Sequence, residues 1–279
     1  MDPAVENFIR LVPLGFLVGI YSALVGTGGG FLIVPLLLIM FPAETPDTLT
    51  SISLAVVFFT AYAGTLTYAR MGRIDYFYGM LFALAGIPGI ILGTTAVEYV
   101  PKRHFTFIVG FILLGLGFFL VKRPTRKRGQ SKKSNPKKRP KQNPEPKQEP
   151  EQEFSRRLPI LGAVASGYIG VISGFLGIGG GIIRVPFMVH VMRFRPHIAT
   201  ATSLFALSIV AFTGIVSKAV RGAFFTGIDK TMYLAVGVMM GAPLGAALST
   251  KFRGPALVRL LAIALCAVGI KMIRDAVMD

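Results

Sequence analysis

The chain has 279 residues, of which 53% are hydrophobic and only 15% are charged, and its formal net charge is +17. Soluble domains carry about 25% charged residues, so this composition excludes most soluble proteins and predicts an all-α integral membrane protein. The single cysteine, Cys266, excludes a disulfide framework and a paired-cysteine metal site.

Apolar blocks of membrane-spanning length lie in two sets on either side of a charged segment. The first set is near 8–41, 50–69, 76–97 and 104–121, and the second is near 158–192, 198–217, 231–250 and 256–273. Similar motifs recur in the same order in both sets. We therefore predict two homologous repeats of about four transmembrane segments each, at 1–121 and 158–279, joined by a linker at 122–157.

The first block of each set is interrupted by a glycine cluster that a proline follows. The two sequences are GTGGGFLIVP at 26–35 and GIGGGIIRVP at 177–186. Adjacent glycines cost about 1 kcal/mol each in a helix and proline removes a hydrogen-bond donor, so each block is expected to be a broken helix. Unwound backbone in a membrane must be sheltered by protein or line an aqueous cavity. Close helix packing at small residues is the alternative interpretation.

A helix break favours an anion, because the resuming half-helix presents unpaired N–H groups and the positive end of its dipole. The glycines predicted to bind an anion in this way are Gly28, Gly29, Gly30, Gly179, Gly180 and Gly181. Arg184 follows three residues after Gly181. Because a guanidinium in lipid costs about 3 kcal/mol on insertion scales, Arg184 should face a cavity or a partner, where it can bind an oxyanion. Snorkelling to the headgroups is the alternative.

Hydroxyl side chains open the second block of each set. These residues are Thr50 and Ser51 in the first set and Thr202 and Ser203 in the second. They are candidate N-caps, and they are also candidate ligands that complete the shell around the same anion. Lys218 and Arg221 are predicted to be helix-end anchors at the membrane surface.

The linker at 122–157 holds 14 Lys or Arg against 4 Glu, so it contributes +10 of the net charge. Its composition predicts disorder. A basic loop between membrane segments is expected to stay on the cytoplasmic side, where anionic lipid headgroups attract it. It lacks interleaved aromatic residues, so nucleic acid is not an expected partner.

The loops after the two broken blocks differ in charge. Glu44 and Asp47 make the first loop acidic, whereas Arg193, Arg195 and His197 make the second basic. Opposite charge is expected if the loops face opposite sides of the membrane, so we favour inverted repeats over parallel ones.

The doubled GxGGG(F/I)(L/I)xVP segments, the Thr-Ser pairs and the Gly-x-Pro at 86–88 and 241–243 resemble the TauE/SafE family of membrane permeases, known for sulfite and organosulfonate export. The resemblance implies a secondary transporter of a small sulfur-containing anion, such as sulfite or a sulfoacetate-like sulfonate, in the cytoplasmic membrane. An anion channel or a transporter of a non-sulfur organic anion is the alternative, and the coupling ion stays open. The expected partners are a small anionic substrate and membrane lipids, and a homodimer is compatible with this class.

An enzyme is not expected. The three histidines, one cysteine and scattered acids give no metal-ligand spacing and no convincing catalytic base, so no cofactor or metal is predicted.

Overall fold

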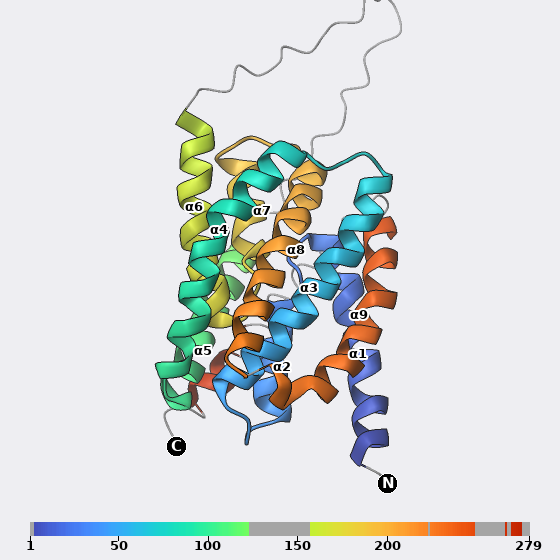
Figure 1. Cartoon of the computed structure of the whole chain (residues 1–279), viewed down its shortest axis with the longest axis vertical. Coiled ribbons are helices and arrows are strands. Elements are labelled where there is room, and N and C mark those ends of the chain that lie inside the picture. Colours follow the sequence, from blue (N-terminus) through green and yellow to red (C-terminus); the bar gives the residue numbers. More distant parts are fainter. Residues whose placement is uncertain (1–2, 123–156, 223, 249–265, 267–268, 275–279) are drawn as a thin grey trace, which may run out of the picture.

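A computed structural model describes residues 3–122, 157–222, 224–248, 266 and 269–274 (Figure 1). Within these ranges the chain is helical and contains no strand. The elements are α1 (Pro3–Val25), α2 (Gly30–Met40), α3 (Pro46–Arg70), α4 (Tyr76–Ala96), η1 (Val97–Tyr99), α5 (Lys102–Lys122), α6 (Arg157–Leu176), α7 (Gly181–His190), α8 (Pro196–Val220), η2 (Phe225–Gly227) and α9 (Ile228–Leu248). Most of the predicted linker and of the block near 256–273 lies outside the described residues.

Six helices in the described ranges are long and apolar enough to cross a membrane: Glu6–Val25, Pro46–Arg70, Tyr76–Tyr99, Pro159–Leu176, Pro196–Val220 and Phe225–Leu248. Many large apolar side chains on them point outward, including Leu17, Phe77, Leu92, Tyr168, Phe212 and Met240. A soluble protein rarely exposes so much apolar surface, whereas lipid covers it without cost. These findings confirm an all-α, multi-pass membrane protein.

The helices before and after the linker are interleaved: α1 packs against α9, and α4 packs against α6. Glycines make both contacts close. A Cβ on Gly89 of α4 would stand 2.2 Å from the carbonyl oxygen of Gly167 on α6, and a Cβ on Gly241 of α9 would stand 2.2 Å from that of Phe16 on α1. Small residues let membrane helices approach closely, so the glycines allow these two pairs to pack backbone against backbone.

Side-chain contacts fix the helix directions. The hydroxyl of Tyr68, late in α3, donates to the carbonyl oxygen of Ala23, late in α1, so α1 and α3 run the same way. Asp47, early in α3, pairs with Lys218, late in α8, so α8 runs the opposite way. The backbone N–H of Asp75, just before α4, donates to Thr202, early in α8, and α4 therefore runs with α8. We call the two ends of the bundle the Asp47 end and the Asp75 end.

The broken helices form hairpins that return to opposite ends. Glu44, just beyond α2, is three residues before Asp47, so α2 returns to the Asp47 end, where Glu44 pairs with Lys230 at the start of α9. Beyond α7, the ring of Phe194 packs on Tyr78, near the start of α4, with centroids 5.3 Å apart, so α7 returns to the Asp75 end. In Figure 1, α2 accordingly descends while α7 rises. The prediction that both blocks break is confirmed.

The predicted helix starts need correction. Helices α3 and α8 begin with Pro46 and Pro196, so the four hydroxyl residues predicted as caps lie inside the helices. The N-cap of α3 is Thr45, whose hydroxyl accepts from the backbone N–H of Thr48 at 3.3 Å. The prediction was wrong because hydropathy finds the apolar part of a helix, whereas the polar first turn belongs to the helix as well.

Candidate functional site

The two glycine breaks pass one another inside the bundle. A Cβ on Gly30 would stand 2.5 Å from the carbonyl oxygen of Gly177, and a Cβ on Gly181 would stand 2.7 Å from that of Thr27. The last residue of each break thus lies beside the first part of the other, so the two segments are antiparallel. Neither position has room for a side chain.

The same two side chains support both breaks. Gly28 and Gly179 each pack against Val57 of α3 and Leu207 of α8. The glycines of the breaks take a φ between 66° and 83°, a range that other residues rarely adopt. They are Gly26, Gly28, Gly29, Gly177, Gly179 and Gly180. The six glycines predicted to bind an anion, at 28–30 and 179–181, are therefore brought together where α2 and α7 begin.

Arg184 lies in the first turn of α7, and its side chain is buried with a residue exposure of only 1%. Its Nη2 donates to the hydroxyl of Ser166 on α6 at 3.3 Å, whereas Nε and Nη1 have no hydrogen-bond partner. The nearest groups also include Gly86 of α4, where a Cβ would stand 3.6 Å from Nη2. The head group thus points between α4 and α6, and the snorkelling alternative is excluded.

The guanidinium of Arg184 is a buried charge that has no counter-charge among the described residues. Within the described part of the chain, no carboxylate lies within ion-pairing distance of it. A buried charge is costly unless it is paired, and an arginine has five N–H donors, of which this one uses one. The arrangement can therefore accept a ligand that is negatively charged and has several acceptor oxygens.

Three buried hydroxyls near the breaks also have no partner: Thr27, Ser173 and Ser203. Thr27 belongs to the first break, and Ser173 lies against Gly180 of the second. Ser203 is on the same face of α8 as Leu207, one turn away, and Leu207 packs against both breaks. Thr27, Ser166 and Ser173 are not predicted from the sequence, because their only signal is a small polar residue within an apolar block.

The other predicted hydroxyls are engaged elsewhere. Thr50 and Ser51 donate to the carbonyl oxygen of Asp47 at 3.0 and 2.7 Å. Thr202 accepts from the backbone N–H of Asp75 at 3.0 Å. The structure therefore does not gather these three with Arg184. The Thr-Ser pairs of the two sets are also not equivalent in the structure. Gly177 packs on Thr50, whereas Gly26 packs on Thr200, so the residue of α8 that corresponds to Thr50 is Thr200 and not Thr202.

A family model described as "Sulfite exporter TauE/SafE" matches residues 11–272. The chain belongs to the TauE/SafE family. The match to the TauE/SafE model includes both glycine breaks and Arg184. No solved structure matches the chain significantly.

Relatives of this TauE/SafE protein carry transporter names. A "Probable membrane transporter protein YunE" of Bacillus subtilis is 29% identical over 277 residues, which are 97% of this chain and 99% of the relative. A "Probable membrane transporter protein" of Xylella fastidiosa strain 9a5c is 27% identical, over 89% of this chain and 87% of the relative. With the apolar helices, these matches identify a TauE/SafE membrane transporter.

Proposed function

We propose that this TauE/SafE protein is a secondary transporter that moves a small sulfur-containing oxyanion, sulfite or a short organosulfonate such as sulfoacetate, across the cytoplasmic membrane. The observation that carries the proposal is the buried guanidinium of Arg184, whose Nε and Nη1 have no partner. Three oxygens on one sulfur atom suit these donors, and the negative charge offsets the cost of burying the arginine. The family description favours sulfur among the possible oxyanions.

The glycine breaks complete the proposed site. Helices α2 and α7 begin at Gly30 and Gly181, and their first N–H groups and positive dipole ends favour the same anion. The hydroxyl of Ser203, which has no hydrogen-bond partner in the described part of the chain, supplies a further donor. Thr50, Ser51 and Thr202 join this shell only if they give up their present hydrogen bonds.

Alternating access follows from inverted repeats, which we propose for the halves at 1–121 and 158–279. In support, α1 and α6, the first helices of the two halves, run in opposite directions, and the hairpins α1–α2 and α6–α7 return to opposite ends of the bundle. Transporters of this kind bind substrate between the repeats and rock one against the other.

The Asp75 end is the proposed cytoplasmic side. Arg70 ends α3 and Arg73 lies between α3 and α4 at this end, and Arg193 and Arg195 lie between α7 and α8. The linker joins α6 at the same end, where positive charge marks the cytoplasmic face and anionic lipids attract it. At the Asp47 end, by contrast, Lys218, Arg221 and Lys230 are each paired with an acid.

Anion binding to the purified protein tests the proposal. We expect sulfite or sulfoacetate, in a thermal-shift panel with taurine, sulfate, oxalate and chloride, to raise the melting temperature. Arg184→Ala should weaken that binding about 30-fold or more, because truncating a buried charged partner costs about 2–5 kcal/mol. Arg70→Ala, which removes an exposed arginine, is the matched control.

Three outcomes count against the proposal. If no anion raises the melting temperature of the folded protein, the proposal of a sulfur-containing anion is wrong. If Arg184→Ala binds the anion with normal affinity, Arg184 lies outside the site. A shift by oxalate alone would indicate a non-sulfur organic anion. Flux into proteoliposomes distinguishes a carrier from a channel, because unlabelled anion on the opposite side accelerates exchange only through a carrier.

A further inference from the structure

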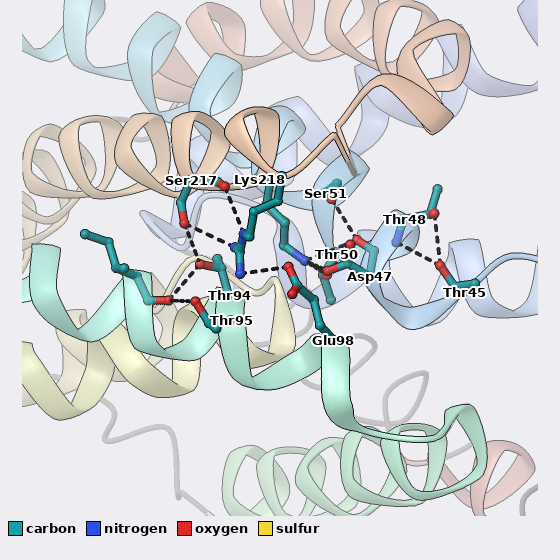
Figure 2. Close-up of polar contacts among 12 residues, drawn as sticks. Thr45, Asp47, Thr48, Thr50, Ser51, Thr94, Thr95, Glu98, Ser217 and Lys218 are labelled. Atoms are coloured by element: carbon teal, nitrogen blue, oxygen red, sulfur yellow. Dashed lines mark hydrogen bonds and ion pairs between the residues drawn. The ribbon is translucent and has the colours of Figure 1, made fainter.

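A buried ion pair joins the two halves of the chain at the Asp47 end. The ammonium group of Lys218, late in α8, pairs with the carboxylate of Asp47 in the first turn of α3 (Figure 2). It also donates to the hydroxyl of Thr50 at 3.1 Å. The Lys218 side chain is 0% exposed and that of Asp47 is 19% exposed, so the pair lies just inside the surface. Lys218 is therefore not the surface anchor that its position near the end of an apolar block predicted.

A second set of contacts lies beside this pair and also connects the halves. The guanidinium of Arg221, just beyond α8, pairs with Glu98 of η1 at 2.7 Å. The hydroxyls of Thr94 on α4 and Ser217 on α8 are 3.2 Å apart (Figure 2). We call the residues of both sets the ion-pair cluster: Asp47, Thr50, Thr94, Glu98, Ser217, Lys218 and Arg221. It ties α3, α4 and η1 to the end of α8.

The helix dipoles favour the positions of both charges in the central pair. Asp47 lies where the positive end of the α3 dipole favours a carboxylate, and Lys218 lies where the negative end of the α8 dipole favours a cation. A buried lysine that loses its carboxylate is strongly disfavoured unless water reaches it. The pair is therefore stable in two situations, with the helix ends closed together or with both charges hydrated.

The ion-pair cluster also contacts the second glycine break. Thr50, which accepts a hydrogen bond from Lys218, packs directly against Gly177, the first residue of that break. One turn further along α3, the hydroxyl of Ser53 donates to the carbonyl oxygen of Gly177 at 2.7 Å. A shift of the break that carries α7 and Arg184 thus acts on α3 within one turn of Asp47.

The Asp75 end lacks the same pair. Helices α3 and α8 have 25 residues each, and the second residue of α8 is His197 where α3 has Asp47. By the same count α3 has Tyr68 where α8 has Lys218. Among the described residues, an aspartate–lysine pair at these positions is therefore confined to the Asp47 end of the bundle.

We propose that the Asp47–Lys218 pair, with its neighbours in the ion-pair cluster, is a gate that closes the Asp47 end of the transporter in this conformation. Opening to that side breaks the pair and lets water reach both charges. The inference rests on the alternating access of the proposed function, but it needs no particular substrate.

Thiol accessibility tests the gate without a substrate. The starting protein carries Cys266→Ser and Leu54→Cys. Leu54 is fully buried one turn beyond Thr50 on α3 and packs against Gly214 of α8, so the one thiol lies beneath the pair and leaves the hydrogen bonds of the ion-pair cluster intact. We expect Lys218→Met to increase the rate of modification by a charged maleimide at least tenfold in the purified protein. Lys271→Met, which removes an exposed lysine with no ion pair among the described residues, should leave the rate unchanged. Equal rates in Lys218→Met and Lys271→Met would overturn the proposal.

A disulfide gives a second test that does not depend on how Lys218→Met folds. Thr94→Cys with Ser217→Cys, in the Cys266→Ser protein, places two thiols where the hydroxyls are 3.2 Å apart. We expect oxidation to stop exchange of whichever anion the protein transports, and reduction to restore it, with each single cysteine as control. Full exchange by the crosslinked protein would show that this end need not open. A failure of sulfite or sulfoacetate to bind leaves the accessibility result unaffected, so the two proposals fail separately.

Discussion

Gly181, the first residue of α7, lies against the main chain of Thr27 in the opposite break, where its Cβ would stand 2.7 Å from the carbonyl oxygen. The reciprocal contact places Gly30 against Gly177. The two halves of the chain thus touch through bare backbone at the point where both helices are broken. One break therefore cannot shift toward the other without displacing it, which couples the two hairpins mechanically.

This contact predicts the effect of Gly181→Ala. The added methyl group has to displace backbone, not a flexible side chain, so we expect a loss of about 1–3 kcal/mol in stability and a lower melting temperature. Gly115→Ala is the control, because a Cβ there meets nothing within 4 Å. Similar melting temperatures for both variants would contradict the close approach.

The α4–α6 contact allows a matched pair of substitutions within one interface. A Cβ on Gly89 would stand 2.2 Å from the carbonyl oxygen of Gly167, whereas a Cβ on Gly167 would meet the carbonyl oxygen of Ala85 at an ordinary 3.4 Å. We expect Gly89→Ala to push α4 away from α6 and to lower the free energy of unfolding by about 1–3 kcal/mol, which lowers the melting temperature by several degrees. Gly167→Ala should melt close to the wild type. A reversed order would mean that the two helices pack through other faces.

The breaks could be predicted from sequence because their cause is local. Adjacent glycines followed by proline weaken a helix wherever they occur, so Gly28–Gly30 and Gly179–Gly181 were sufficient evidence. The partners of the helices could not be predicted in this way. The contact of Gly89 with Gly167 depends on which face of α4 meets α6, and apolar blocks carry little information about that face.

Lys218 shows the same limit for charged residues. Its place near the end of an apolar block predicts a surface anchor, but its partner Asp47 is 171 residues away in the sequence. Only the antiparallel packing of α3 on α8 brings the two together. Arg184 was predicted to be sheltered because of its cost in lipid, a property of the residue itself, whereas the hydrogen bond with Ser166 follows from the fold.

Ser53 and Ser203 occupy equivalent turns of α3 and α8 but have different hydrogen bonds. Ser53 donates to the carbonyl oxygen of Gly177 at 2.7 Å, and Ser203 has no partner. We expect Ser53→Ala to cost about 1–3 kcal/mol in stability, because it leaves a buried carbonyl unsatisfied. Ser203→Ala should leave the stability of the ligand-free protein unchanged and weaken anion binding. Melting temperatures with and without sulfite separate the two effects, and normal anion affinity in Ser203→Ala would remove Ser203 from the site.

Ser166 holds the guanidinium of Arg184 and is predicted to act on the anion through it. Its hydroxyl accepts from Nη2 at 3.3 Å and donates to the carbonyl oxygen of Phe82 at 2.6 Å. Ser166→Ala frees the arginine to change rotamer, so we expect affinity for the anion to fall about fivefold, less than in Arg184→Ala, since one hydrogen bond contributes about 1 kcal/mol. Ser166→Thr keeps the hydroxyl and should restore the affinity for the anion. If Ser166 only supported the contact with α4, anion affinity and stability would change together. Ser208→Ala is the control, because that hydroxyl donates only to Phe205 within its own helix. Unchanged affinity in Ser166→Ala would mean that the anion itself, and not Ser166, fixes the position of Arg184.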